Sequence, residues 1–470
     1  MTPTTTLTYG LRYEFMSPLV DLDYANSNLD LSSGVPQVFI GGQNGYPRGL
    51  MYANHTNFAP RLGLAQNLPR LGVVAHIAYG IFYTPVDMNT WCNQRHNVPY
   101  VFPETAQSDP YIDSIKTLNF PTPVLGTTAV SFTSVQLHAQ AQYIQQWSTS
   151  LEKQLGAETT VEVGYLGAGG FHLQRSHLIN NAQPGPGLIQ PRRPFPKISF
   201  VNNTVFPAAV ASTMTSSTFP ATTINLLENT SQSWYDAGYV NARRRASNRL
   251  SFLANYTFAK ALENAPDFRS PMFEAATPQN NDDLKAEKGP GCDIRQRFAL
   301  SAVYSPPVYG RNGRTRALTR DWRGSVEYQA QTGFPMTMSV FGDTANAGTV
   351  VGENPIRANS TGEKIFASGT KNSTTWFNPG AFAAPPAYTY GNVGRNSVYG
   401  PGMQTMDLAL VRSFSLAQRS RFETRAEFFN ALNHTNLGTP NRFVNTSSFG
   451  SITEVATPGR EIQLSARVSF

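Results

Sequence analysis

Hydrophobic and polar residues alternate strictly along many short segments of this 470-residue chain. The alternation is clearest in residues 460–470, where every second side chain is apolar and those between are polar. A β-strand has a side-chain period of two, so the pattern predicts a strand with one apolar and one polar face. The apolar face of this last segment consists of Ile462, Leu464, Ala466, Val468 and Phe470.

The same alternation recurs along the whole chain and predicts about twelve strands, each roughly ten residues long or longer. No run of about 18 apolar residues interrupts it, so the sequence predicts no transmembrane helix. The alternating segments are 7–15, 58–64, 73–83, 143–155, 159–166, 234–245, 250–258, 298–304, 322–340, 406–414, 422–428 and 462–470.

Short and long connections alternate between these segments. The short ones are 66–70, 156–158, 246–248, 306–319 and 415–418, and the long ones are 17–56, 84–140, 168–232, 261–295, 342–402 and 433–458. In an antiparallel sheet this order places all long connections on one side. Short periplasmic turns opposite long extracellular loops are typical of outer-membrane barrels. The pattern therefore predicts an all-β fold, an antiparallel transmembrane β-barrel.

The two faces of the predicted strands support this interpretation. Many charged residues occupy polar-face positions, as expected for a wet lumen: Arg12, Glu14, Arg61, His76, Glu152, Glu162, Asn255, Asp407, Glu423, Arg425, Glu427, Glu461 and Arg467. Aromatic residues gather near strand ends, as in Tyr9, Trp147 and Trp322, which is typical of interface girdles. Aromatic cross-strand pairs in a soluble sheet are the alternative.

Composition agrees with a β-rich chain. Only 14% of residues are charged while 11% are aromatic, against about 25% charged in soluble domains; disordered chains lack aromatics. The net charge of +7 comes from scattered basic residues, so we expect Arg243, Arg244 and Arg245 to form a solvated or phosphate-facing rim and no nucleic-acid site. Cys92 and Cys292 lie in no metal or redox spacing. We expect two free thiols and leave a disulfide between them open.

Catalytic and cofactor motifs are absent from the sequence. There is no phosphate-binding loop, nucleophile elbow or zinc-protease motif, so we expect no enzyme, no cofactor and no metal site. His172 and His177, and the acidic residues around 21–23 and 280–283, are expected to be loop side chains without a metal. The glycine-rich segment 164–170 is expected to let a strand bend into a loop.

Several segments resemble the C-terminal part of the barrel of TonB-dependent outer-membrane transporters, in the Oar-like subgroup. Each motif is weak alone, but their order and spacing are fairly specific and cover nearly the whole chain. They are 57–63 (NFAPRLG), 79–83 (YGIFY), 145–156 (QQW to QLG), 163–167 (VGYLG), 251–257 (SFLANYT), 293–298 (DIRQRF), 377–382 (FNPGAF), 391–396 (GNVGRN), 400–402 (GPG) and 425–434 (RAEFFNALNH).

The resemblance implies a 22-stranded barrel with an N-terminal plug and a TonB box, in the outer membrane of a Gram-negative bacterium. About twelve strands correspond to the C-terminal half, so we expect residues 1–470 to be one partial barrel domain without plug or N-terminal strands. It would be a truncated product, a chain with a mis-assigned start, or one piece of a split gene. Phe470 is expected to be the signal read by the barrel assembly machinery.

Three hypotheses for the function are compatible with an all-β chain of this kind. The first is the barrel part of a transporter that contacts outer-membrane lipid and takes up an unknown extracellular ligand, with TonB a partner only if a plug is supplied elsewhere. The second is a passive pore or adhesin-like barrel that closes alone, which requires the strand at 7–15 to pair with that at 462–470. The third is a soluble all-β carbohydrate-active protein whose loop carboxylates act as acid and base.

Overall fold

The computed structural model describes most of the chain. The described residues are 4–23, 25–85, 87, 91–101, 129–206, 208–211, 216–245, 249–266, 275, 277–310, 313–349, 356–416 and 420–470. The predicted turn at residues 246–248 and part of that at 415–418 lie outside the described residues. Among the described residues helix occurs in short pieces, which include η1 (Asn93–His96), η2 (Gln190–Arg192), α2 (Ala208–Ala211), α3 (Gly313–Thr319) and η3 (Pro379–Ala381).

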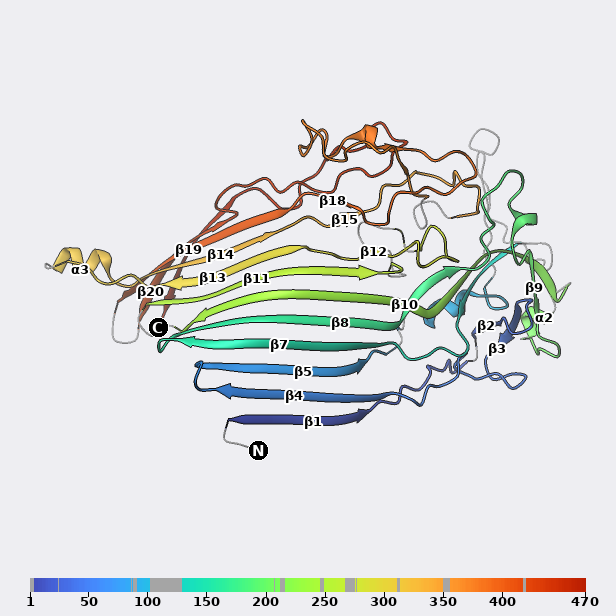
Figure 1. Ribbon diagram of the computed structural model, residues 1–470, viewed down its shortest axis with the longest axis horizontal. Coiled ribbons are helices and arrows are strands. Elements are labelled where there is room, and N and C mark those ends of the chain that lie inside the picture. The colour runs from blue at the N-terminus through green and yellow to red at the C-terminus, as the bar shows by residue number, and fades with distance from the viewer. Residues whose placement is uncertain are drawn as a thin grey trace.

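Twelve long strands form one antiparallel sheet in which each strand pairs with its neighbour among them in the chain (Figure 1). This confirms the predicted all-β antiparallel fold and the expected number of strands. The strands are β1 (Thr5–Tyr13), β4 (Phe58–Leu68), β5 (Val73–Tyr83), β7 (Tyr143–Leu155), β8 (Thr159–Leu178), β10 (Thr218–Arg244), β11 (Leu250–Glu263), β13 (Gln296–Tyr304), β14 (Trp322–Gln331), β19 (Met403–Ser415), β20 (Arg421–Phe429) and β21 (Glu461–Ser469).

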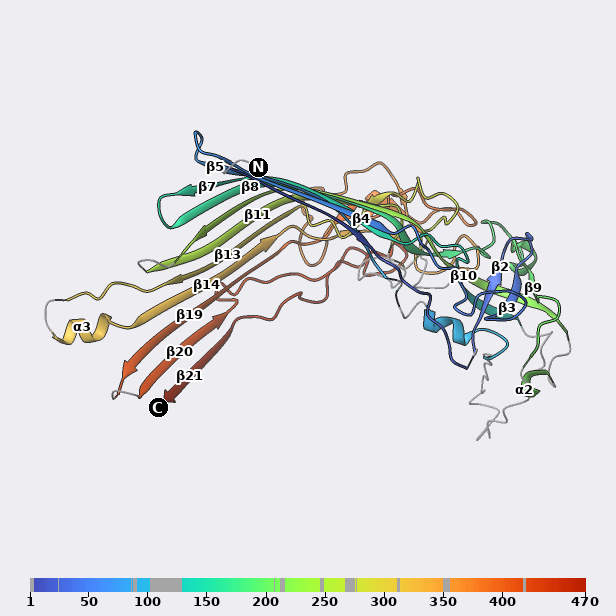
Figure 2. The ribbon, with the colours of Figure 1, turned by 90° about the horizontal axis from the view of Figure 1, so that it is seen from below.

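The sheet is curved and open. It curls continuously from β1 to β21, and the two terminal strands lie apart at opposite edges (Figure 2). Within the described residues β1 pairs only with β4, and β21 only with β20. The two edges therefore carry unpaired backbone N–H and C=O groups, which are costly in hydrocarbon.

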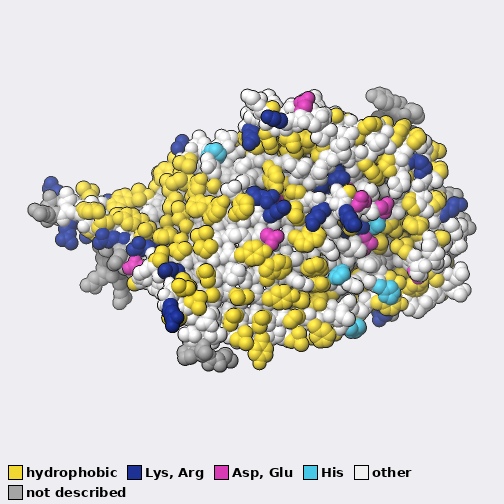
Figure 3. Space-filling view, viewed as in Figure 1, with side chains coloured by type: hydrophobic (Ala, Val, Ile, Leu, Met, Phe, Trp, Pro, Cys, Tyr) yellow, Lys and Arg dark blue, Asp and Glu magenta, His cyan; other side chains and the backbone are white. Residues whose placement is uncertain are grey.

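The strand register joins the apolar positions into a continuous outward face. Ala254, Leu300, Tyr328 and Met406 are successive cross-strand partners on β11, β13, β14 and β19. The space-filling view shows hydrophobic side chains spread over these strands (Figure 3). An apolar face of this kind matches a sheet whose outer side meets lipid.

Short and long connections sort to opposite ends of the sheet, as predicted. Residues 69–72 and 156–158 are tight turns, and β13 and β14 are joined through α3, at the same end of the molecule (Figure 1). The long connections all leave the other end. This end is extracellular if the sheet is oriented like other outer-membrane barrels.

The long connections are not structureless, because two of their regions build folded lobes. In the first lobe β2 (Ser27–Asp30), β3 (Gln37–Ile40), β6 (Val130–Val135) and β9 (Lys197–Phe200) join the outer part of β10. Val38, Phe132, Phe219 and Ile224 are buried at its centre.

The remaining short strand of the large sheet is β12 (Gly289–Pro290), which pairs with the end of β11.

The second lobe is formed mainly by residues 332–402. It contains two small strand pairs, β15 (Pro335–Met336) with β18 (Val398–Tyr399) and β16 (Asn359–Ser360) with β17 (Phe382–Ala383). Met336, Met338, Phe377 and Phe382 pack in its core. Both lobes bury apolar side chains away from the membrane-facing sheet, so each has a small hydrophobic core of its own.

Two predictions about strand boundaries were wrong. The segment 322–340 is not one strand: β14 ends at Gln331, and a side chain at Gly333 would lie only 2.0 Å from the Gly400 carbonyl oxygen. This close backbone approach and Pro335, which lacks an N–H, turn the chain into the second lobe.

The glycine-rich segment 164–170 also stays within β8, and the predicted loop at 168–232 is partly strand. A Cβ at Gly167 would lie 2.2 Å from Nε1 of Trp147, and one at Gly164 would lie 2.5 Å from Cζ of Tyr239. These glycines make room for aromatic rings on neighbouring strands. The strand bends instead at His172, whose φ is +53°, where the register with β10 shifts.

Candidate functional site

The concave face of the sheet is polar, as the sequence predicted. The predicted lumen residues lie on this face, except that Glu14 follows the end of β1. One register row brings together Glu152, Glu162, Asn241 and Asn255 from four consecutive strands. Glu162 accepts hydrogen bonds from Tyr239 Oη at 2.9 Å and from Asn241 Nδ2 at 3.4 Å.

Ion pairs offset three other carboxylates of this face. Arg243 lies 3.4 Å from Glu152, and Arg425 lies 3.1 Å from Glu427 and 3.8 Å from Glu423. The expected arginine rim is thus tied into the sheet. The concave surface is a lining of mixed charge.

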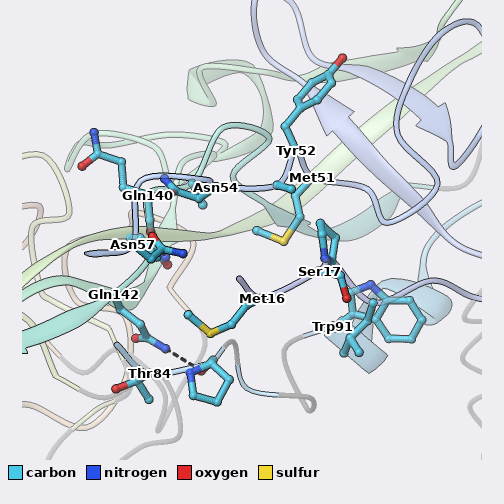
Figure 4. A pocket seen from close by; sticks show the side chains of 17 residues that line it. Met16, Ser17, Met51, Tyr52, Asn54, Asn57, Thr84, Trp91, Gln140 and Gln142 are labelled. Atoms are coloured by element: carbon cyan, nitrogen blue, oxygen red, sulfur yellow. Dashed lines mark hydrogen bonds between the residues drawn. The ribbon is translucent and has the colours of Figure 1, made fainter. Parts of the chain in front are cut away.

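A cavity of about 360 Å³ lies at the outer end of the sheet (Figure 4). Its walls come from the segments that follow β1 and β5, from those that precede β4 and β7, and from β10. Met16, Leu19, Met51, Tyr52 and Trp91 supply most of the apolar surface. Cavities of this size that are lined by aromatic and aliphatic groups are typical small-molecule sites.

Neutral amides provide the polar part of the cavity. Asn54, Asn57, Gln140, Gln142 and Asn229 line it, and its described wall contains no charged side chain. Two of these amides are already fixed: Gln142 Nε2 donates to the Pro85 carbonyl at 3.0 Å, and Asn229 Nδ2 donates to that of Gln140 at 2.7 Å. These bonds hold the rim in place without a ligand.

The indole N–H of Trp91, a residue of this wall, is buried within the protein. Nε1 is buried and has no hydrogen-bond partner among the residues that the structure describes. A buried unpaired donor is costly, and such groups are often satisfied by a ligand or by water. The cavity therefore offers apolar walls and neutral amides, a combination that suits an uncharged, partly apolar molecule.

A second cavity, of about 430 Å³, adjoins the first lobe and contains an ionisable pair. Tyr46 Oη donates to Asp30 Oδ2 at 2.5 Å. Burial and the bond to Asp30 raise the pKa of Tyr46 to about 12. Burial also opposes ionisation of Asp30, but hydrogen bonds from Tyr46 and Ser32 outweigh it, so the pKa of that carboxyl is lowered.

The remaining predicted site residues have separate places in the structure. Cys92 and Cys292 are exposed on long connections, and no disulfide joins them. His177 lies 3.0 Å from Glu228 and 3.7 Å from Asp282. The ring of His172 instead lies tilted against that of Tyr143, with the centroids 5.8 Å apart, so the two histidines belong to different contacts. In the described part of the chain no group of three or more His, Cys, Asp or Glu side chains could hold a metal.

Sequence reasoning missed the cavity entirely. Trp91, Met16 and Met51 lie in connections with no periodic pattern, and only the fold brings them together. It also missed two charges on the outward face, Asp236 and Lys260, which are cross-strand partners. Tyr165 donates a hydrogen bond to Asp236 there.

Across the described residues, no helix is long and apolar enough to cross a membrane.

Comparison with solved structures finds similar sheets in larger proteins. The outer membrane transporter YddB from Escherichia coli is 10% identical, with a TM-score of 0.47 over 89% of this chain and 41% of that one. The siderophore receptor PirA from Acinetobacter baumannii is 10% identical, with a TM-score of 0.43; the match covers 100% of this chain and 44% of that one. The ferric enterobactin receptor PfeA from Pseudomonas aeruginosa is 10% identical, with a TM-score of 0.42; the match covers 100% of this chain and 43% of that one.

The chain thus spans about two fifths of the length of these structures. No curated protein sequence matches it. A family model described as an outer membrane beta barrel domain matches residues 1–463. The twelve-stranded sheet, its apolar outer face and its sorted loops agree with that match, and the chain belongs to the family of outer membrane beta barrel domains of Gram-negative bacteria.

Proposed function

We propose that this chain is the barrel part of a TonB-dependent transporter that takes up an uncharged, partly apolar ligand. The observation that carries the proposal is the cavity at the outer end of the sheet, whose described wall is uncharged and combines apolar side chains with neutral amides. A ligand held there by loops would next meet the polar concave face. Binding and passage, and no catalysis, are the chemistry that these surfaces support.

The open sheet supports a part of a larger barrel over a self-closed pore. A pore made of this chain alone needs β1 to pair with β21, and within the described residues these strands pair only with β4 and β20. We propose that strands supplied elsewhere cover both edges, and that TonB acts on a plug that is also supplied elsewhere. Lipid and the barrel assembly machinery complete the set of proposed partners.

Capture of ligand from culture medium tests the proposal. The full chain, purified in a non-ionic detergent, is incubated with concentrated medium, and the small molecules that it retains are identified by mass spectrometry. Ala139→Trp fills the cavity, while Ala387→Trp adds the same side chain at an exposed loop position outside it. We expect uncharged molecules to be retained by the wild type and by Ala387→Trp, and about tenfold less by Ala139→Trp, a loss of about 1.4 kcal/mol.

Equal retention by all three proteins would contradict a ligand site in this cavity. Retention of charged molecules alone would contradict the proposed ligand class. Trp91→Ala sharpens the test, because it removes an aromatic side chain from the cavity wall. We expect this variant to bind the same molecules more weakly.

A further inference from the structure

An arginine lies on the apolar face of the sheet at its short-turn end. Arg412 on β19 is the cross-strand partner of Trp322 on β14. In the same pair of strands, Met406 and Tyr328 are partners on the outward face. Trp322 and Arg412 are separated from them by an even number of residues, so their side chains lie on this outward face as well. A charge on the lipid side of a barrel is tolerated near the membrane surface, where it reaches water and headgroups.

Two aromatic rings and α3 hold the side chain of Arg412. Its Cζ lies 5.1 Å from the centre of the Trp322 ring and 4.5 Å from that of Phe414, which are cation–π distances. Its Nη2 donates a hydrogen bond to the Ala317 carbonyl of α3. Trp322 Nε1 donates to the Leu318 carbonyl at 2.8 Å. Because both bonds start from outward side chains, α3 lies on the lipid side of the strand ends.

The connection that contains α3 presents an excess of positive charge. Residues 305–323 contain five arginines and one carboxylate, that of Asp321. Arg314 and Arg316 are exposed on α3, and no ion pair joins them to a carboxylate among the residues that the structure describes. Arg320 lies 3.6 Å from Asp321, but both side chains are about half exposed, so this pair is weak. Basic side chains gather around this end of the molecule (Figure 3).

Apolar side chains are exposed beside these arginines. Leu318 is 66% exposed and Tyr309 is 63% exposed, and Leu416, on the turn that follows β19, is 61% exposed. Thr319 Oγ1 donates to the Tyr309 carbonyl at 2.7 Å and accepts from its N–H at 3.0 Å, which holds Tyr309 against the end of α3. Exposed apolar groups combined with unpaired arginines are typical of a segment that lies in a membrane interface.

We propose that α3 and the adjoining ends of β14 and β19 bind the headgroups of anionic phospholipids in the membrane leaflet on the short-turn side. Tyr309 and Leu318 enter the acyl boundary, while Arg314, Arg316 and Arg320 donate charge-assisted hydrogen bonds to phosphate oxygens. A lipid fits this surface better than a free anion, because the arginines continue the apolar face of the sheet. The surface lies at the opposite end of the sheet from the proposed ligand cavity, so its test is independent of the proposed function.

The test compares the affinity of the full chain for phosphatidylglycerol and for phosphatidylcholine with the same acyl chains. Each lipid is titrated into the protein in a non-ionic detergent, and bound lipid is counted by native mass spectrometry. A basic residue beside anionic lipid contributes about fivefold in affinity. Arg314→Gln, Arg316→Gln and Arg320→Gln together are therefore expected to lower the preference for phosphatidylglycerol about 100-fold. The matched control removes three exposed lysines of the long connections and is expected to keep the preference: Lys197→Gln, Lys285→Gln and Lys364→Gln.

Equal affinity of the wild type for the two lipids would overturn the proposal. Equal losses in the arginine variant and the lysine control would overturn it as well, because net charge rather than this surface would then set the preference. Glycerol phosphate, the headgroup without acyl chains, is added as a competitor. Displacement of the lipid at equal concentration would identify a site for free phosphate and refute a membrane surface, whereas a loss confined to the arginine variant, without displacement, supports the proposal.

Discussion

Replacing Leu300 by arginine tests which face of the sheet meets lipid. Leu300 is the fifth of the nine residues of β13, and its cross-strand partners are Ala254 and Tyr328 on the apolar face. Nine residues extend about 30 Å, or about 23 Å along the membrane normal at a tilt of about 40°, close to the height of an apolar band of about 25 Å. Leu300 therefore lies near the middle of the membrane.

Arginine near the midplane on the lipid face of a barrel costs about 2–4 kcal/mol. Leu300→Arg should accordingly lower the folded-to-unfolded ratio by about 30- to 900-fold. Ser301 is the matched control, because the adjacent residue points to the polar face and its cross-strand partner is Glu327. An arginine at position 301 remains hydrated and gains an opposite charge, so Ser301→Arg should change stability by less than about 1 kcal/mol.

Urea unfolding of both variants in phospholipid vesicles, followed by tryptophan fluorescence, measures the difference. The expected result is a large loss of stability for Leu300→Arg and a small change for Ser301→Arg. Equal losses, or a larger loss for Ser301→Arg, would refute the assignment of the two faces.

Three further predictions concern the strand end and the first lobe. Phe470→Asp should reduce the yield of membrane-assembled protein, measured by outer-membrane fractionation, whereas Ser469→Asp on the polar face should not. The pKa of Asp30 is lowered, so its contribution to stability is lost as pH falls through the lowered carboxyl pKa. The pKa of Tyr46 is raised to about 12, so its contribution is lost as pH rises from about 10 to 12. Hydrogen exchange of β2 and β3 should show both losses in the wild type. In Tyr46→Phe the loss at high pH should be absent and the acid loss smaller, because the hydrogen bond from Ser32 to Asp30 remains. Phe132→Ala should destabilise the first lobe by about 3–5 kcal/mol and expose it to proteases without preventing membrane assembly.

The membrane-spanning sheet was predictable because its signal is local. Strict alternation at 73–83 and 143–155 gave strands with the bounds of β5 and β7. Turns such as 156–158 then fixed which strands are neighbours. In a sheet of consecutive antiparallel strands, sequence order is also spatial order, so no distant pairing had to be inferred.

The outer lobes and the cavity were not predictable for the opposite reason. In the first lobe, β6 pairs in parallel with β10, and β3 pairs in parallel with β9, although these partners lie far apart in sequence. β3 and β9 have only four residues each, and β6 has six. Such short segments carry little periodic signal. Trp91 is one residue before the exposed Cys92, and nothing in its own segment indicates a cavity wall.

Labelling of cysteines on intact cells tests most directly that the sheet crosses the outer membrane with its long connections outside. The reagent is a maleimide attached to a polymer too large for the outer membrane to admit. Cys92 is an exposed thiol on a long connection of the wild type. A triple variant, Ala157→Cys with Cys92→Ser and Cys292→Ser, has a single thiol in the exposed turn between β7 and β8. Labelling of the wild type on intact cells, and of the turn cysteine only after permeabilisation, is the predicted result. A turn cysteine labelled on intact cells, with the wild type unlabelled until permeabilisation, would contradict the orientation on which the account rests.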